Sequence, residues 1–212
     1  MQEVTRRFSR YSVGCCSHIS HSRFSQDRLS EVWQKPVRAS AFSIGPNAFR
    51  GCGFRNLWLP ETVTSISHHA FAECQYLNNL NLPKNITVLE PYTFYKCQQL
   101  QWISLSNITS FGDGCFLGSG ITEVDFGKYT KSLGRYLFGC RPNGPGCDSR
   151  DFIDSKITCI MVEAAYPPAC SYETFDGINV RDCTLIVPLG SADLYSKQPG
   201  WNLFKKVIEM NF

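Results

Sequence analysis

Phenylalanine recurs at a nearly constant interval through the middle of this 212-residue chain. The intervals are 22, 23, 22 and 22 residues, between Phe49, Phe71, Phe94, Phe116 and Phe138. Further apolar residues keep fixed offsets from each phenylalanine, and the clearest unit reads Val63-x-x-Ile66-x-x-x-Ala70-Phe71-x-x-Cys74-x-x-Leu77-x-x-Leu80-x-Leu82-Pro83. Such a period predicts a solenoid, because one unit of this length cannot bury its apolar face alone.

The end of each unit predicts a short strand. Side chains alternate along a strand, so Leu80 and Leu82 share one face. Stacking the units about 4.8 Å apart pairs these strands in a parallel ladder. Proline ends such strands at Pro60, Pro83 and Pro188 because it cannot donate to the ladder. We therefore expect strands near 57–59, 80–82, 103–105 and 124–126, and a second short extended run at each Val-x-x-Ile.

The expected fold is a β-rich repeat solenoid, a right-handed stack of about seven coils of 22–23 residues, with short turns or 3-10 segments opposite the ladder. Residues 1–39 are interpreted as a degenerate N-terminal coil that caps the stack. Residues 40–190 form the solenoid, with an insertion at 141–156 that begins with several Gly and Pro residues. Residues 191–212 are expected to form a C-terminal cap.

The net charge of +3 is unevenly distributed. Residues 1–38 hold seven Lys/Arg and three Asp/Glu, a balance of +4, so the remainder carries −1. A basic segment attracts nucleic acid or acidic glycans, but its arginines are too few to form a groove. We interpret it as a solvated cap and expect no nucleic-acid partner.

The repeat resembles the BspA-type leucine-rich repeat. The likeness covers residues 40–126 well and 127–190 loosely, and the closing segment with Tyr166-Pro-Pro168, Thr184–Pro188 and Gly200-Trp201 is similar to the cap common in that family. The resemblance implies surface or secreted proteins of host-associated bacteria and some protozoa, which act in adhesion and protein binding. It implies no catalytic residues.

Neither an export signal nor a membrane span is visible. No stretch reaches the roughly 20 apolar residues that cross a bilayer, and the start lacks the charged-then-apolar layout of a secretory leader. Either the chain is cytosolic or a leader was removed. The resemblance favours the cell surface or the extracellular space.

Eleven cysteines raise the question of metal or disulfides. Cys52, Cys74 and Cys97 occupy one slot of successive coils, and a line of thiols does not make the tetrahedron that zinc needs. We predict that they are reduced and buried as small apolar residues. The cluster Cys15-Cys16-Ser17-His18-Ile19-Ser20-His21 matches no standard zinc spacing. We expect no metal and no cofactor.

No pairing of nucleophile and base stands out, so we expect no enzyme activity. Two of the four histidines lie in the degenerate coil, and His68 and His69 are assigned to an exposed turn. The sequons at Asn85 and Asn107 fit glycosylation acceptors. The stronger explanation is that both are turn positions, because each lies where the repeat places its turn before Val-x-x-Ile.

The candidate binding surface is the outward side of the expected ladder. Its residues alternate with the buried leucines, as Asn56, Trp58, Asn79, Asn81, Trp102, Ser104, Glu123 and Asp125. We select Trp58, Asn81, Trp102, Ser104, Glu123 and Asp125 as candidate ligand-binding residues, because tryptophan is over-represented at binding hot spots. The alternative is that both tryptophans pack against each other or against the terminal segments.

These observations favour a non-enzymatic protein-binding or adhesion module, presented at a bacterial cell surface or secreted, with a protein or host-matrix ligand. A second hypothesis is a carbohydrate-binding accessory protein that stacks sugars on Trp58 and Trp102. A third is a structural spacer that holds another domain away from the surface.

Overall fold

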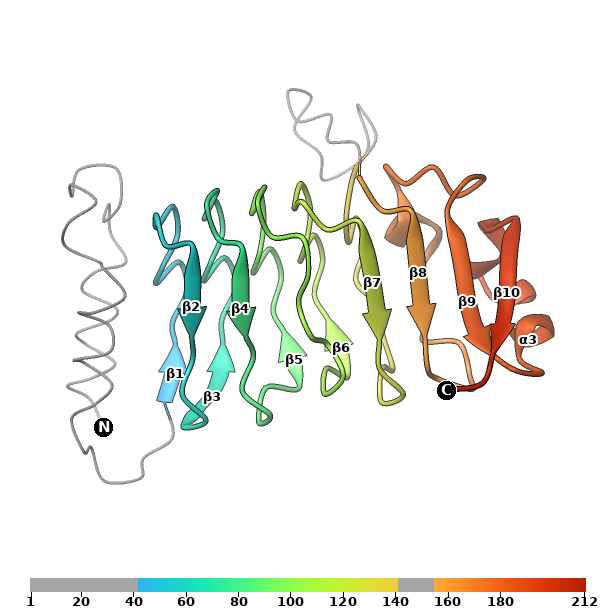
Figure 1. Ribbon diagram of the computed structural model, residues 1–212, viewed down its shortest axis with the longest axis horizontal. Helices are drawn as coiled ribbons and strands as arrows, with labels where there is room; N and C mark the ends of the chain where they lie inside the picture. Colours follow the sequence, from blue (N-terminus) through green and yellow to red (C-terminus); the bar gives the residue numbers. More distant parts are fainter. Residues whose placement is uncertain (1–41, 141–154) are drawn as a thin grey trace.

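The computed structural model describes residues 42–140 and 155–212. The expected N-terminal coil and most of the insertion lie outside the described residues. The elements follow in the order β1 (Phe42–Ile44), β2 (Asn56–Trp58), β3 (Val63–Ile66), β4 (Asn79–Asn81), β5 (Val88–Leu89), β6 (Ser110–Phe111), β7 (Glu123–Phe126), β8 (Cys159–Val162), η1 (Tyr172–Phe175), β9 (Thr184–Pro188), α3 (Ala192–Ser196), η2 (Trp201–Leu203) and β10 (Lys206–Met210). They form a parallel β-solenoid of about seven turns, as the repeat predicted (Figure 1).

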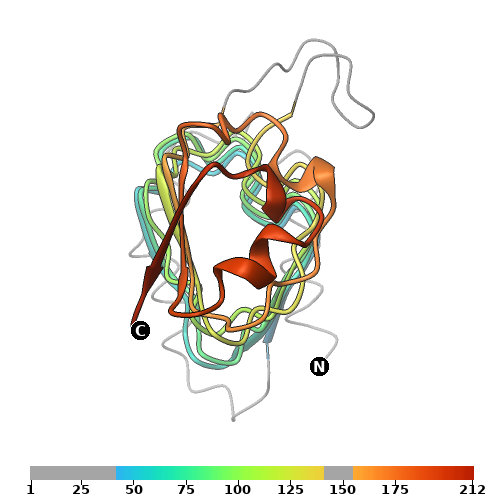
Figure 2. The same cartoon turned by 90° about the vertical axis from the view of Figure 1, so that its right-hand side faces the viewer.

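Two sets of parallel strands run along the solenoid. The main ladder consists of the pair β2–β4 and the four-stranded sheet β7–β8–β9–β10. The second set consists of the pairs β1–β3 and β5–β6, and single bridges continue it through Ser132 to Ala169. All pairings are parallel. Seen along the axis, the turns superimpose (Figure 2), and the second set confirms the extended runs expected at Val-x-x-Ile.

The main ladder is interrupted at the fourth expected strand. Strands occur at 56–58, 79–81 and 123–126, but none is present at 103–105, so that expectation was wrong. Ile103 and Leu105 nevertheless keep their buried slots. Ile103 follows Leu80 by 23 residues, the same interval as between the paired Leu57 and Leu80, so repeat length does not account for the missing pairing with β4. On this face the buried side chains continue the stack without strand pairing, while backbone hydrogen bonds such as Lys96 N to Leu117 O join the same turns elsewhere.

The core is built around a column of stacked phenylalanines. Phe71 and Phe94 have ring centroids 5.7 Å apart and planes 6° apart, and Phe94 and Phe116 repeat this at 5.6 Å and 5°. Phe49 and Phe138 extend the column at its two ends. All five rings are buried, which confirms that the periodic phenylalanine fills the interior of each turn.

The chain turns sharply just before each phenylalanine. Residues at corresponding places adopt positive φ, with values of 55°, 56°, 57°, 60° and 54° at Asn47, His69, Tyr92, Gly114 and Tyr136. The left-handed region is costly for residues other than glycine. Hydrogen bonds between turns offset the cost, because His69 N donates to Pro91 O and Tyr92 N donates to Asp113 O.

The C-terminal end of the core is covered by η1, α3 and η2 (Figure 2). Tyr195 and Trp201 are fully buried there. Tyr195 Oη donates to Ala164 O at 2.7 Å, and Trp201 Nε1 donates to Pro168 O at 2.8 Å. The polar atoms of both large rings are therefore satisfied while their apolar surface closes the stack.

Candidate functional site: the outer face of the main ladder

The outward side chains of the main ladder form two rows, which we call the first and second outer rows. The first row contains Asn56, Asn79, Trp102, Glu123, Cys159, Thr184 and Lys206. The second row contains Trp58, Asn81, Ser104, Asp125, Met161, Ile186 and Ile208. Strand pairing aligns the members on β2 and β4 and those on β7 to β10. Trp102 and Ser104 follow Asn79 and Asn81 by one 23-residue repeat, and neither is paired.

Both tryptophans project into solvent. Trp58 is 58% exposed and Trp102 is 64% exposed, and neither ring contacts another described aromatic ring. The alternative in which the two rings pack on each other is therefore wrong. They lie in different rows and two turns apart, a separation of about 10 Å along the stack. One ligand of moderate size can span both.

Asparagines link the first turns of this face. Asn79 Nδ2 donates to Asn56 Oδ1 at 2.7 Å. Asn81 Oδ1 accepts from Leu59 N at 2.9 Å, and its Nδ2 donates to Leu59 O at 3.3 Å. The amide of Asn81 thus clamps the backbone that follows β2, while the residue still reaches solvent. Replacing Asn81 would therefore disturb this local structure as well as any contact that Asn81 makes with a ligand.

An acidic stretch follows the tryptophans. Glu123 and Asp125 are exposed, and Glu163 lies just beyond β8 on the neighbouring turn. Desolvation raises the pKa of the Asp125 carboxyl, and the charge of Glu163 raises it further. The structure thus brings Glu123 and Asp125 onto the same face as Trp58, Trp102 and Ser104.

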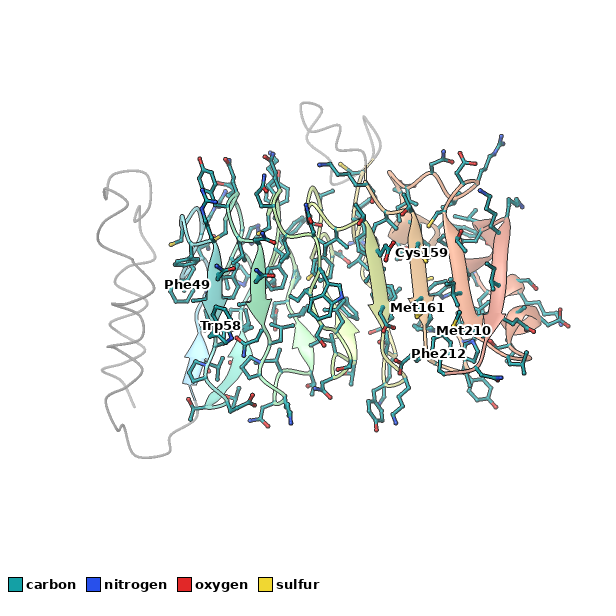
Figure 3. All side chains as sticks on the ribbon, in the orientation of Figure 1. Phe49, Trp58, Cys159, Met161, Met210 and Phe212 are labelled. Carbon is teal, nitrogen blue, oxygen red and sulfur yellow. The ribbon has the colours of Figure 1, made fainter. Side chains whose placement is uncertain are left out.

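Sequence reasoning missed an apolar zone at the C-terminal end of the outer face. Cys159, Met161 and Ile186 are partly exposed, while Ile208 is 49% and Met210 44% exposed. Figure 3 shows the labelled side chains Cys159 and Met161 on β8 and Met210 at the far end of the ladder. The signal was present in the uninterrupted apolar runs Cys159–Val162 and Leu185–Val187, because a strand with one solvated face alternates polar and apolar residues.

The remaining candidates for chemistry are dispersed. His68 is exposed as expected, but His69 is partly buried and stacks on Tyr92 at 4.9 Å. Burial is the main cause that lowers the pKa of His69, and Arg50 adds to it. In residues 42–140 and 155–212, no three His, Cys, Asp or Glu side chains come together as metal ligands. The cluster at residues 15–21 lies outside this part of the chain.

The cysteine slot behaves as predicted. Cys52, Cys74, Cys97 and Cys115 are buried, and none of the four forms a disulfide. Burial strongly raises the pKa of Cys97 and of Cys115, so these thiols stay protonated. Cys140 differs, because it is disulfide-bonded and lies in a small separate apolar cluster with Leu117 and Tyr136.

The first sequon has a structural role in the repeat. Asn85 Nδ2 donates to Glu61 O of the preceding turn at 3.0 Å. The exposed Asn107 occupies the corresponding place one repeat later. The turn role therefore accounts for Asn85 without glycosylation.

Among the described residues, no helix is both long enough and apolar enough to cross a membrane.

Comparisons with known proteins agree with the repeat. A family model for the BspA type leucine-rich repeat region matches residues 17–143 in six copies. A crystal structure of a leucine-rich repeat protein from Bacteroides ovatus is similar at 21% identity and a TM-score of 0.41, and the match covers 79% of this chain and 46% of that one. The chain thus spans less than half of that structure. A comparison with curated proteins found no match.

Proposed function

Because the chain belongs to the BspA-type leucine-rich repeat family, we propose that it is a non-enzymatic binding module that captures a protein on the outer face of its main ladder. The observation that carries the proposal is the exposure of Trp58 and Trp102 in the two outer rows of the main ladder. Leaving two indole rings in water is unfavourable, and tryptophan is enriched where interfaces gain most of their energy.

The surroundings of the tryptophans support a protein ligand. Asn56, Asn79 and Ser104 supply neutral polar groups beside the rings, and Glu123 and Asp125 add negative charge on the next turn. A polar rim around aromatic anchors is the usual anatomy of a protein interface. Carboxylates at one end of the face favour a ligand with basic residues at the corresponding end.

We place this module at a cell surface or outside the cell, with a host-matrix protein as the class of ligand. The family resemblance favours this location. The disulfide at Cys140 supports it, since disulfides persist in oxidising compartments and are rare in the cytosol.

Binding of the whole chain to a panel of immobilised extracellular-matrix proteins tests the proposal. For a ligand captured by the native chain, Trp58→Ala and Trp102→Ala should each weaken affinity by about tenfold or more. Tyr166→Ala is the matched control, since Tyr166 is 79% exposed and lies outside both outer rows. Equal capture by all variants would contradict binding through this face.

A carbohydrate ligand is the second candidate, because exposed indole rings also serve as stacking platforms for sugars. A glycan array probed with the same variants distinguishes a carbohydrate ligand from a protein ligand. Glycan capture that is lost with either tryptophan, without any protein capture, would replace the first proposal by the second. Absence of both kinds of binding would leave the spacer hypothesis.

A further inference from the structure

The last strand of the main ladder has a free edge. β10 pairs with β9 along Lys206–Met210, and no described strand lies on its other side. Figures 1 and 2 show β10 at the end of the stack, beside α3. All five residues of β10 are exposed. An exposed edge of this length presents unpaired backbone groups and is a template for another strand.

Exposed aliphatic side chains gather at this end of the molecule. The large aliphatic residues exposed in the described chain are Val88, Leu189, Leu194, Val207, Ile208 and Met210. Five of these six lie between residues 189 and 210. Exposed apolar residues scattered singly need no explanation, but a group at one end of a molecule marks an interaction surface.

The backbone of β10 is oriented for pairing through alternate residues. Leu189 N donates to Met210 O at 3.0 Å, so Met210 directs its polar groups toward β9. Alternation along a strand then directs those of Lys206 and Ile208 the same way, and those of Val207 and Glu209 toward the free edge. A new strand must therefore bond to Val207 and Glu209.

The charges beside this edge are self-complementary. Lys205 has no hydrogen-bond or ion-pair partner among the described residues. Four residues on, Glu209 is held in place because its Oε1 accepts from Ala192 N at 2.8 Å. Val207 lies midway between the two. An antiparallel copy of the same strand, related by a two-fold axis at Val207, would place Lys205 of each copy opposite Glu209 of the other.

We propose that two copies of this chain associate end to end by antiparallel pairing of their β10 strands about Val207. The pairing joins the two four-stranded sheets into one sheet of eight. It satisfies the outward backbone groups of Val207 and Glu209 and forms two equivalent cross-strand ion pairs between Lys205 and Glu209. It also places the aliphatic stem of Lys206 beside Ile208 of the other copy. We choose a second copy over an unrelated extended peptide because the edge is complementary to itself.

The area involved is small, so the association should be weak. An edge of five residues buries less than the roughly 800 Å² per partner of a standard interface. Sedimentation velocity of the 212-residue chain at about 5 to 500 µM should therefore show a reversible shift from monomer to dimer. A monomer at every concentration would overturn the proposal, and an aggregate that grows without limit would overturn the two-fold geometry.

Charge variants test the register. Lys205→Glu and Glu209→Lys each replace both ion pairs by like-charge contacts, so each variant alone should dimerise at least about tenfold more weakly. An equimolar mixture of the two restores opposite charges at both sites and should recover the dimer as a heterodimer. Lys131→Glu is the matched control, because Lys131 is exposed on a distant turn. Dimerisation unaffected by Lys205→Glu, or no recovery in the mixture, would refute the register.

A backbone variant tests strand pairing itself. Val207→Pro removes an N–H that faces the free edge, not β9, and proline is tolerated on edge strands. Its circular dichroism should match that of the native chain while the dimer is lost. A dimer that persists in this variant would show that another surface holds the copies together.

Discussion

The thiol of Cys97 donates a hydrogen bond to the carbonyl oxygen of Phe71 on the preceding turn, with Sγ and O 3.1 Å apart. Cys74 repeats the contact with Phe49 O at 3.0 Å. The slot therefore does more than hold a small apolar residue. Its weak donor adds a link between successive turns, next to the column of phenylalanines.

We expect the buried thiols of the repeat to be unreactive in the folded protein. Burial blocks access to Cys52, Cys74, Cys97 and Cys115, and the raised pKa of Cys97 removes the reactive thiolate. Labelling with a thiol reagent at neutral pH, followed by peptide mapping, should leave these four unmodified. Labelling in denaturant should modify all four. A mapped disulfide between any two of them would contradict the structure.

Two aromatic residues of one repeat should differ sharply in their effect on stability. Phe94 is fully buried and Trp102 is 64% exposed. Phe94→Ala leaves a cavity and should cost about 3–5 kcal/mol in the free energy of unfolding. Trp102→Ala should change it by less than about 1 kcal/mol. Denaturant melts of both variants decide this, and a comparable loss in Trp102→Ala would place its ring in the core.

Gly134 allows two neighbouring turns to approach closely. A Cβ at position 134 would lie 2.5 Å from Asp113 N and 2.6 Å from Gly112 O. Gly134→Ala should therefore destabilise the protein by about 1–3 kcal/mol, since the backbone of one turn must move. Gly45→Ala is the control, because nothing lies within 4 Å of its added Cβ. Thermal melts should show a loss for the first variant only.

The stability of the acidic stretch should depend on pH. The folded state raises the pKa of Asp125, mainly by desolvation and further by Glu163. Folding then favours the protonated form, so the stability contributed here is highest at low pH and falls as pH rises from the unfolded pKa to the raised folded pKa. Asp125→Asn should raise Tm at pH 7 and have little effect near pH 3.

Glu163→Gln provides the internal control for that prediction. Removing the Glu163 charge removes one cause of the raised pKa, so the stabilising effect of Asp125→Asn at pH 7 should shrink in this background. An effect of Asp125→Asn that is the same at pH 3 and pH 7 would mean that its origin is packing and not charge.

Much of the architecture follows from local spacing in the sequence. The phenylalanine interval and the alternation around Leu57 and Leu80 determined a solenoid of short parallel strands with Trp58 turned outward. Side-chain direction along a strand depends only on neighbouring residues, so the inward or outward placement of each ladder residue was readable without knowledge of its contacts.

Other features depend on groups 20 or more residues apart, and only the tertiary structure decided them. The missing strand at 103–105, the clamp of Asn81 on Leu59 and the extension of the ladder by β10 all arise from how neighbouring turns align. Buried side chains tolerate small shifts between turns, because packing contacts are non-directional. Hydrogen bonds, by contrast, weaken steeply with misalignment. Whether the strands of two neighbouring turns pair therefore depends on how the whole turns are positioned relative to each other, and the sequence of a single repeat does not encode that position.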